Sequence, residues 1–141
     1  IHHCGGVGTG MRTKLVNNHL AIVSCAFNAE ALALSQRFGL SLEKTLDLVP
    51  GTTATNGQLK IAWASKVLKG DTAPGFTIDL AHKGLTLIVE AARATKVPMP
   101  IGATALESFS AARAHGDGAK DFSAMVDILC DSAHIDRPRL P

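Results

Sequence analysis

The residues best suited to chemistry stand near the start of the sequence, where Lys14 is followed by the adjacent amides Asn17 and Asn18. A spacing of three and four residues places these side chains on one face if the stretch is helical. One ammonium that can donate a proton, beside two amides that can orient a ligand, suits a site for a small hydroxycarboxylate. Two asparagines also disfavour a helix interior, because their amides compete for backbone hydrogen bonds. The alternative is an ordinary helix surface with a solvated lysine and two solvated amides.

Gly5, Gly6, Gly8 and Gly10 precede this cluster, and a glycine-rich stretch can form a phosphate-binding loop. Their spacing does not match Gly-x-Gly-x-x-Gly, no Lys-Ser or Lys-Thr follows as in a P-loop, and no strand pattern precedes them. We therefore interpret residues 1–10 as a flexible linker into a helix, where glycines allow close approach to a ligand or another domain.

Metal-binding and nucleophilic motifs are weak. His2, His3 and Cys4 stand together, but no second ligand group lies at a metal-ligand spacing, so we expect no bound metal. No Ser-His-Asp arrangement or nucleophile elbow is present in the sequence. The remaining histidines are isolated, and we expect them at helix surfaces or ends: His19, His82, His115 and His134.

Composition and charge narrow the class of protein. The 141 residues are 46% hydrophobic and 18% charged, which fits one globular domain rather than a disordered chain. The 14 basic and 12 acidic residues are scattered along the chain, and the aromatic side chains do not alternate with basic ones. Nothing in this pattern indicates a nucleic-acid partner.

The cysteines and the apolar runs indicate the compartment. Cys4, Cys25 and Cys130 are an odd number without a Cys-x-x-Cys pair, which favours a reduced, cytoplasmic protein. No apolar run approaches the ~20 residues that span a bilayer, so we expect no membrane partner. The first residue is Ile1 rather than Met, and we expect the chain to be part of a longer protein.

Apolar residues recur with a helical period along the chain, and no convincing β-strand alternation is present. The expected helices cover residues 11–38, 42–49, 56–68, 79–95, 102–114 and 121–130. We predict an all-α fold class with about six helices, in which residues 11–132 form one domain. Residues 133–141 would form a tail that is frayed or lies on a neighbouring chain.

The first helix would have roughly 28 residues and a length of about 42 Å, more than the ~30 Å breadth of a small domain. Its apolar residues do not all fit the ~100° stripe that faces a single core. These residues are Leu15, Val16, Ile22, Val23, Phe27 and Leu32. We therefore expect the helix to pack on another domain or subunit, in a homodimer or higher homo-oligomer.

Several motifs together resemble one enzyme family. The string from Gly6 through Lys14, Asn17 and Asn18 resembles the signature that opens the C-terminal domain of 3-hydroxyisobutyrate dehydrogenase-like enzymes, the β-hydroxyacid dehydrogenases. The blocks at residues 78–83 and 97–100 look especially like a member that acts on a sulfonated C3 aldehyde. The similarity extends over nearly the whole chain, through residues 29–31, 69–71, 74–76, 79–83, 97–100 and 121–124.

The resemblance implies a helical bundle like the C-terminal domain of 6-phosphogluconate dehydrogenase, preceded by a Rossmann domain that holds most of an NAD or NADP cofactor. It implies that Lys14 is the catalytic acid and base during hydride transfer between a small 3-hydroxy acid, or its semialdehyde, and nicotinamide. It assigns substrate contacts to Asn17, Asn18 and Phe76, and a cofactor contact to Lys83. Without the Rossmann domain such a chain would be inactive.

The chain departs from the family pattern in two respects. The family has Lys-Asp where this sequence has Lys83-Gly84, so a carboxylate that could fix the lysine is missing. The Rossmann half, with its glycine fingerprint, is not in these residues. Two alternatives remain: a helical domain of a 6-phosphogluconate dehydrogenase-like or ketopantoate reductase-like enzyme, and a helical oligomerisation module without activity.

Overall fold

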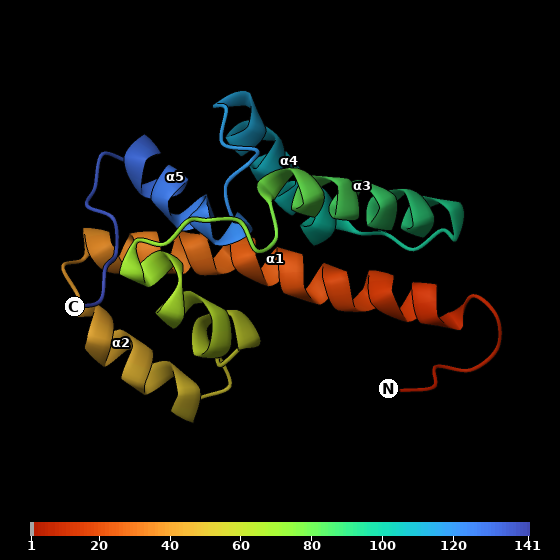
Figure 1. Cartoon of the computed structure of the whole chain (residues 1–141), viewed down its shortest axis with the longest axis horizontal. Coiled ribbons are helices and arrows are strands. Elements are labelled where there is room, and N and C mark those ends of the chain that lie inside the picture. The colour runs from red at the N-terminus through yellow and green to blue at the C-terminus, as the bar shows by residue number, and fades with distance from the viewer. Residues whose placement is uncertain (1) are drawn as a thin grey trace.

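The computed structural model describes residues 2–141, which form five α-helices joined by turns (Figure 1). The α-helices are α1 (Thr9–Arg37), α2 (Leu42–Leu48), α3 (Ile78–Ala94), α4 (Pro100–Ala114) and α5 (Met125–Ser132). The shorter segments are η1 (Val49–Gly51), η2 (Gln58–Ala62), η3 (Trp63–Ser65), η4 (Val67–Lys69) and η5 (Phe122–Ala124). Residues 2–141 contain no β-strand, which confirms the predicted all-α class, and their five α-helices compare with the about six helices predicted.

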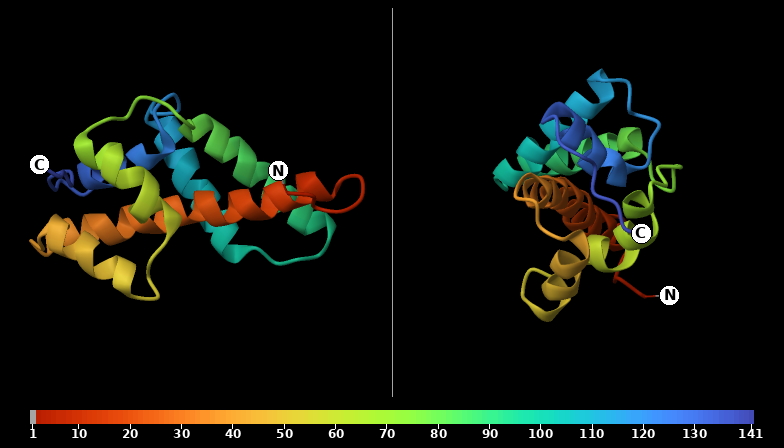
Figure 2. Two further views of the ribbon diagram at one scale, coloured as in Figure 1. Left: turned by 60° about the horizontal axis from the view of Figure 1, so that its bottom comes forward. Right: turned by 90° about the vertical axis from the view of Figure 1, so that its left-hand side faces the viewer.

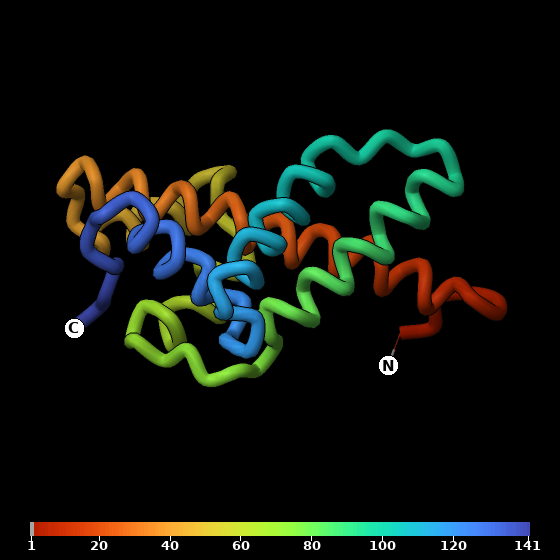
Figure 3. The backbone as a smooth tube through the Cα atoms, turned by 90° about the horizontal axis from the view of Figure 1, so that it is seen from above, coloured from red at the N-terminus to blue at the C-terminus, as the bar shows by residue number. Residues whose placement is uncertain are grey.

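The long helix α1 is the axis on which the other elements pack. Its 29 residues give a length of about 43 Å. Helices α3, α4 and α5 lie on one side of α1, and α2 with the turns that follow it lies on the other (Figures 1 and 2). Seen from above, α5 follows the C-terminal part of α1, while α3 lies over its N-terminal part (Figure 3). Every buried residue of α1 lies at or after Ile22, so the core surrounds only the second half of this helix.

The helix ends follow the capping residues in the sequence. Gly39 adopts a φ of 67° after α1, a conformation that favours glycine. Ser41 caps α2 by accepting a 3.4 Å hydrogen bond from the Lys44 amide. Pro100 stands in the first turn of α4, where its missing N–H leaves no hydrogen bond unmade. Helix α1 begins at Thr9, two residues before the predicted start, and the last predicted helix divides into η5 and α5.

The predicted helix over residues 56–68 is wrong as a single α-helix. A π-helical turn and two 3-10 turns replace it, and Lys66 interrupts them with φ −123° and ψ −102°. Trp63, Val67 and Leu68 are all fully buried in the same core. Five residues along a regular α-helix turn by about 140°, so Trp63 and Leu68 would point in different directions. The irregular turns allow both to face the core.

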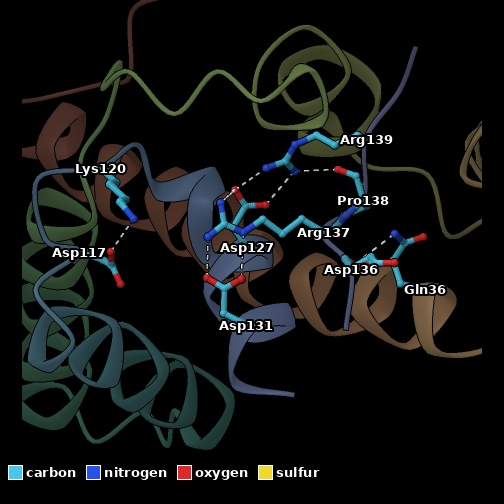
Figure 4. Close-up of polar contacts among 9 residues, drawn as sticks. All are labelled: Gln36, Asp117, Lys120, Asp127, Asp131, Asp136, Arg137, Pro138 and Arg139. Carbon is cyan, nitrogen blue, oxygen red and sulfur yellow. Dashed lines mark hydrogen bonds and ion pairs between the residues drawn. The ribbon is translucent and has the colours of Figure 1, made fainter. Parts of the chain in front are cut away.

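The C-terminal tail packs on its own chain rather than fraying or lying on a neighbour. Arg139 makes two 2.8 Å hydrogen bonds to the buried carboxylate of Asp127 (Figure 4). Arg137 pairs with Asp131 at 2.7 and 2.9 Å. The two aspartates stand four residues apart on α5, and the two arginines stand two apart in an extended segment. Both spacings put like residues on one face, so the pairs form a ladder that holds the tail.

Candidate functional site

The candidate site is built on one face of α1. Lys14, Asn18, Ile22 and Cys25 follow at intervals of four, four and three residues, so they lie along one face. Ile22 and Cys25 are fully buried in the domain core, Asn18 is half-buried and Lys14 is exposed. The stripe that packs the core therefore continues toward the helix N-terminus as a polar surface. We call the surface around Lys14 and Asn18 the Lys14 face.

Asn17 lies on a different part of the helix surface from Asn18. It lines a groove of about 550 Å³ between α1 and η2, together with Leu20, Phe27 and Ile61. Adjacent residues differ by about 100° around a helix axis, so the two amides flank Lys14 on opposite sides. Asn18 lies on the side of α3, whereas Asn17 lies on the side of η2.

Helix α3 forms a wall beside the Lys14 face. A Cβ atom added to Gly84 would lie only 3.1 Å from Cδ1 of Ile22, so the two helices come close together at this point. Lys83 precedes this glycine and is exposed, between Leu80 and Leu87 on the solvent side of α3. This close contact accounts for the absence of a larger residue at position 84, and it could not be predicted from the sequence. A side chain there would press on Ile22.

An aromatic pair lies over the same face of α1, beyond Asn18. The Phe76 and Phe122 rings meet edge to face, with centroids 5.2 Å apart and planes at 80°. The Phe122 carbonyl accepts a 3.1 Å hydrogen bond from Sγ of Cys25. Since Cys25 stands seven residues after Asn18, the Phe122 carbonyl lies about two helical turns, or roughly 10 Å, further along the helix. Phe76 is half-buried in this position.

Asp121 holds the loop that carries Phe76, whereas the sequence placed it only at the start of the helix predicted over residues 121–130. Its Oδ1 caps η5 through the Ser123 amide at 3.1 Å. Its Oδ2 accepts from the amides of Gly75 at 2.9 Å and Phe76 at 3.1 Å. Burial raises the pKa of Asp121, but the hydrogen bonds from Ser123, Phe76 and Gly75 outweigh it, and the pKa lies below its ordinary value.

A second polar cluster joins α3 to α4. His82 Nε2 lies 3.1 Å from Oγ of Ser110, and its Nδ1 lies 3.2 Å from Nη1 of Arg113. Arg113 also donates to Asp79 at 2.6 Å. Burial and the positive charge of Arg113 lower the pKa of His82. We expected His82 on a helix surface, but it lies half-buried between two helices, where it fastens α3 to α4.

The arrangement offers a proton donor and an amide on a rigid helix, a second cation on the neighbouring helix and an aromatic boundary. Across residues 2–141, the side chains of Lys14, Asn18 and Lys83 enter no hydrogen bond or ion pair. These groups can therefore bind an anionic, oxygen-rich ligand without breaking internal contacts. In the same residues, no group of three or more His, Cys, Asp or Glu side chains is placed to hold a metal ion.

Comparison with known proteins identifies relatives for almost the whole chain. The family model described as "NAD-binding of NADP-dependent 3-hydroxyisobutyrate dehydrogenase" matches residues 8–129. The 3-sulfolactaldehyde reductase of Escherichia coli is 42% identical over 131 residues, covering 93% of this chain and 44% of the relative.

Two solved structures agree in fold. The 3-hydroxyisobutyrate dehydrogenase of Salmonella typhimurium superposes with a TM-score of 0.79 at 33% identity, covering 86% of this chain and 42% of that protein. The Mycobacterium tuberculosis 3-hydroxyisobutyrate dehydrogenase, solved with L-serine, gives a TM-score of 0.78 at 30% identity, covering 92% and 46%. The chain spans less than half the length of these relatives. The chain belongs to the 3-hydroxyisobutyrate dehydrogenase family, whose members use NAD or NADP.

Proposed function

We propose that the chain is the helical C-terminal domain of an NAD(P)-dependent β-hydroxyacid dehydrogenase. Residues 11–132 would form a bundle like the C-terminal domain of 6-phosphogluconate dehydrogenase, and residues 1–10 would link it to a Rossmann domain. One observation carries the proposal: the buried stripe of α1 continues as Lys14 and Asn18, whose side chains have no internal partner among residues 2–141. Since Lys14 is exposed and Asn18 half-buried, both groups are open to a ligand or to another domain that packs against this face.

Lys14 is the proposed acid and base. A lysine side chain is ordinarily protonated at neutral pH, so its ammonium can donate a proton to the substrate oxygen as a carbonyl is reduced. In the reverse direction the neutral amine takes the proton from the substrate hydroxyl. Asn18 lies one turn away on the same face, where its amide can donate to a carboxylate or sulfonate and accept from a hydroxyl. The bound nicotinamide supplies or accepts the hydride.

Lys83 is the proposed cofactor contact from this domain. Its exposed ammonium stands between two half-exposed leucines, Leu80 and Leu87. A cation beside apolar surface suits a dinucleotide, which carries both phosphates and flat rings. Phe76 would bound the substrate end of the site, and Asn17 would make a weaker substrate contact from the η2 side. We propose a small 3-hydroxy acid or its semialdehyde as the substrate, because the named relatives act on compounds of this size.

The outer face of α1 supports self-association. Val16, Leu20, Phe27 and Leu34 recur at helical spacing and are between 48% and 66% exposed. Leu20 and Phe27 also line the groove against Ile61, which is 76% exposed. Monomeric proteins rarely leave such a continuous apolar surface uncovered. We propose that a second copy of the chain covers it in a two-fold homodimer.

We propose a cytoplasmic location from the state of the cysteine side chains. Cys4, Cys25 and Cys130 are all unpaired, which suits a reducing cytoplasm. No helix within residues 2–141 is both long and apolar enough to cross a membrane.

The test is Lys14→Ala in the complete dehydrogenase, with Arg12→Ala as the matched control on another face of α1. Loss of an acid-base group should lower kcat by about 10²–10⁴-fold with little change in cofactor affinity. Lys14→Arg keeps the charge but cannot cycle its proton, so it should be nearly as inactive. The 141-residue chain alone should show no turnover. Wild-type kcat in Lys14→Ala, or turnover by the isolated chain, would contradict the proposal.

A further inference from the structure

Asp121 is a buried carboxylate whose partners are all hydrogen-bond donors. It is 2% exposed. Its Oδ1 accepts from the amide and the hydroxyl of Ser123 at 3.1 and 2.6 Å, and its Oδ2 accepts from the amides of Gly75 and Phe76 at 2.9 and 3.1 Å. Within residues 2–141, it forms no ion pair with a lysine, arginine or histidine. Its charge is therefore balanced by four polar hydrogens.

Helix capping alone does not require this carboxylate. Ser, Thr or Asn caps a short helix as well as Asp does, and a buried anion without a cation carries a desolvation cost. The second oxygen, Oδ2, has a role besides capping, because it accepts hydrogen bonds from two consecutive backbone amides of a loop far away in the sequence. Hydrogen bonds to an ionised acceptor are shorter and stronger than those between neutral groups. The carboxylate therefore fixes the backbone at Gly75 and Phe76.

The same loop is held from its other side. The Phe122 amide donates to the Phe76 carbonyl at 2.8 Å, and the Ile78 amide donates to the Lys120 carbonyl at 3.0 Å. Thr77 and Asp121 form an isolated antiparallel bridge. With the Phe76 amide on the carboxylate and its carbonyl on Phe122, the backbone of this residue has no freedom to rotate. Its ring is held against Phe122, which is itself fastened to α1 through Cys25.

We infer that Asp121 is a positioning residue of the Lys14 face, which acts through Phe76. Its carboxylate fixes the loop so that the Phe76 ring stays against Phe122, whose carbonyl lies about two helical turns beyond Asn18, and the ring bounds that end of the site. The inference rests on the proposed function, because it places the substrate on the Lys14 face. It adds the residue that holds the aromatic boundary of that site in place.

The experiment is Asp121→Asn in the complete dehydrogenase. The amide keeps only one acceptor oxygen and no charge, so it cannot accept from Ser123 and from the two loop amides at once, and it binds the pair that it keeps more weakly. Misplacement of a site residue by about 1 Å can lower the rate on the order of 10²-fold. We expect kcat/KM for the best substrate to fall ~10-fold to ~100-fold, mainly through KM. One extra methylene can change kcat/KM by between ~10-fold and ~200-fold in a well-formed pocket. We expect Asp121→Asn to discriminate less strongly than the wild type against a substrate that is longer by one methylene.

Asp127→Asn is the matched control. Asp127 is also a buried aspartate, but Arg139 of the C-terminal tail holds it, away from Phe76. This variant should lose stability and keep its KM and substrate discrimination. In a Phe76→Ala background, Asp121→Asn should add little further change in KM, because its effect passes through that ring. If Asp121→Asn fails to fold, Ser123→Ala removes one donor to the carboxylate and should raise KM in the same direction by a few fold.

The outcomes separate this inference from the proposed function. An unchanged KM in Asp121→Asn, an equal change in Asp127→Asn, or full additivity with Phe76→Ala would overturn the positioning role and leave the dehydrogenase proposal standing. A wild-type complete protein that turns over no 3-hydroxy acid or semialdehyde would overturn both. A rise in KM that is specific to Asp121 and absent in the Phe76→Ala background would support the inference.

Discussion

Asn28 and Asn56 exchange two hydrogen bonds through their side-chain amides, at 2.9 and 3.0 Å, across 28 residues of sequence. Each amide donates to and accepts from the other, so the pair fastens the irregular segment η2 to the middle of α1. Asn28 is almost fully buried, which raises the cost of leaving its amide unpaired.

Removing one partner of this pair should destabilise the fold. We expect Asn28→Ala to lower the free energy of unfolding by about 1–3 kcal/mol, because it leaves the Asn56 amide without its partner. Asn17→Ala is the control, since this exposed amide should change stability by no more than about 0.5 kcal/mol. Urea unfolding followed by the fluorescence of Trp63 measures both. Equal changes in the two variants would show that the amide pair contributes nothing.

The two asparagines after Lys14 should differ in their effect on the reaction. In the complete dehydrogenase, Asn18→Ala should raise KM by roughly 10-fold to 150-fold, because it removes a hydrogen bond to a charged substrate group that contributes about 1.5–3 kcal/mol. Asn17→Ala should change KM less, because Asn17 lines the groove on the η2 side. Steady-state kinetics of the two variants provides the comparison. A larger effect from Asn17 would reverse the assignment.

Most of the helices could be predicted from the sequence, because a period of 3.6 and the capping residues are local signals. The predicted boundaries after residue 38, before residue 42 and at residue 121 lie at Gly39, Ser41 and Asp121, which end or start elements in the structure. The segment around Trp63 could not be predicted, since its π and 3-10 turns follow from contacts with α1 that leave no periodic trace. The same holds for the tail, where Arg139 binds an aspartate on another element. Tertiary contacts decided these regions over local propensity.

The candidate site, like the fold, could be predicted from the sequence only in part. Lys14 and Asn18 were predicted as site residues from their types and spacing, while the prediction of Phe76 and Lys83 came only from the family resemblance. The structure shows how the elements that carry these residues pack on one face of α1: α3 contacts Ile22, and Phe122 contacts Cys25. The hold of Asp121 on the Phe76 loop joins residues 45 or 46 positions apart, and a single sequence gives no sign of it.

Asp121 should make the stability of the fold depend on acid pH. Its pKa is lower in the folded protein than its ordinary value, so the unfolded chain binds the proton more tightly. The resulting stabilisation is fully present above the ordinary aspartate pKa of ~3.9 and is lost as pH falls through the lower, folded value. Urea midpoints measured from about pH 5 to about pH 2 should fall less steeply in Asp121→Asn than in the wild type. Parallel curves would contradict the expectation.

The close contact between Gly84 and Ile22 should appear as coupling between two substitutions. Alanine is favoured over glycine inside a helix by about 0.8–1.0 kcal/mol, but a methyl group at position 84 would press on Cδ1 of Ile22. Gly84→Ala should therefore gain less than this amount in the wild type and nearly all of it in an Ile22→Val background, which lacks Cδ1. We expect a coupling free energy of about 0.5–1 kcal/mol from the double-mutant cycle. Full additivity would mean that Ile22 moves aside without cost.

Self-association should depend on the outer face of α1. Leu20 is 66% exposed beside Phe27, and a glutamate there would place a charge in the middle of the proposed interface. Leu20→Glu should convert the dimer to a monomer at micromolar concentration in sedimentation experiments. Leu48→Glu is the matched control, because Leu48 is 69% exposed at the end of α2 and lies outside this face.

The expected interface is large, because the exposed residues run over most of α1. An interface of the obligate class buries above ~2,000 Å² and resists dilution. Such a dimer would also raise the thermal stability of the chain with its concentration, since binding stabilises the folded state by mass action. A wild-type monomer at micromolar concentration would exclude this interface. A dimer that persists in Leu20→Glu but dissociates in Leu48→Glu would show that the interface lies on the side of α2.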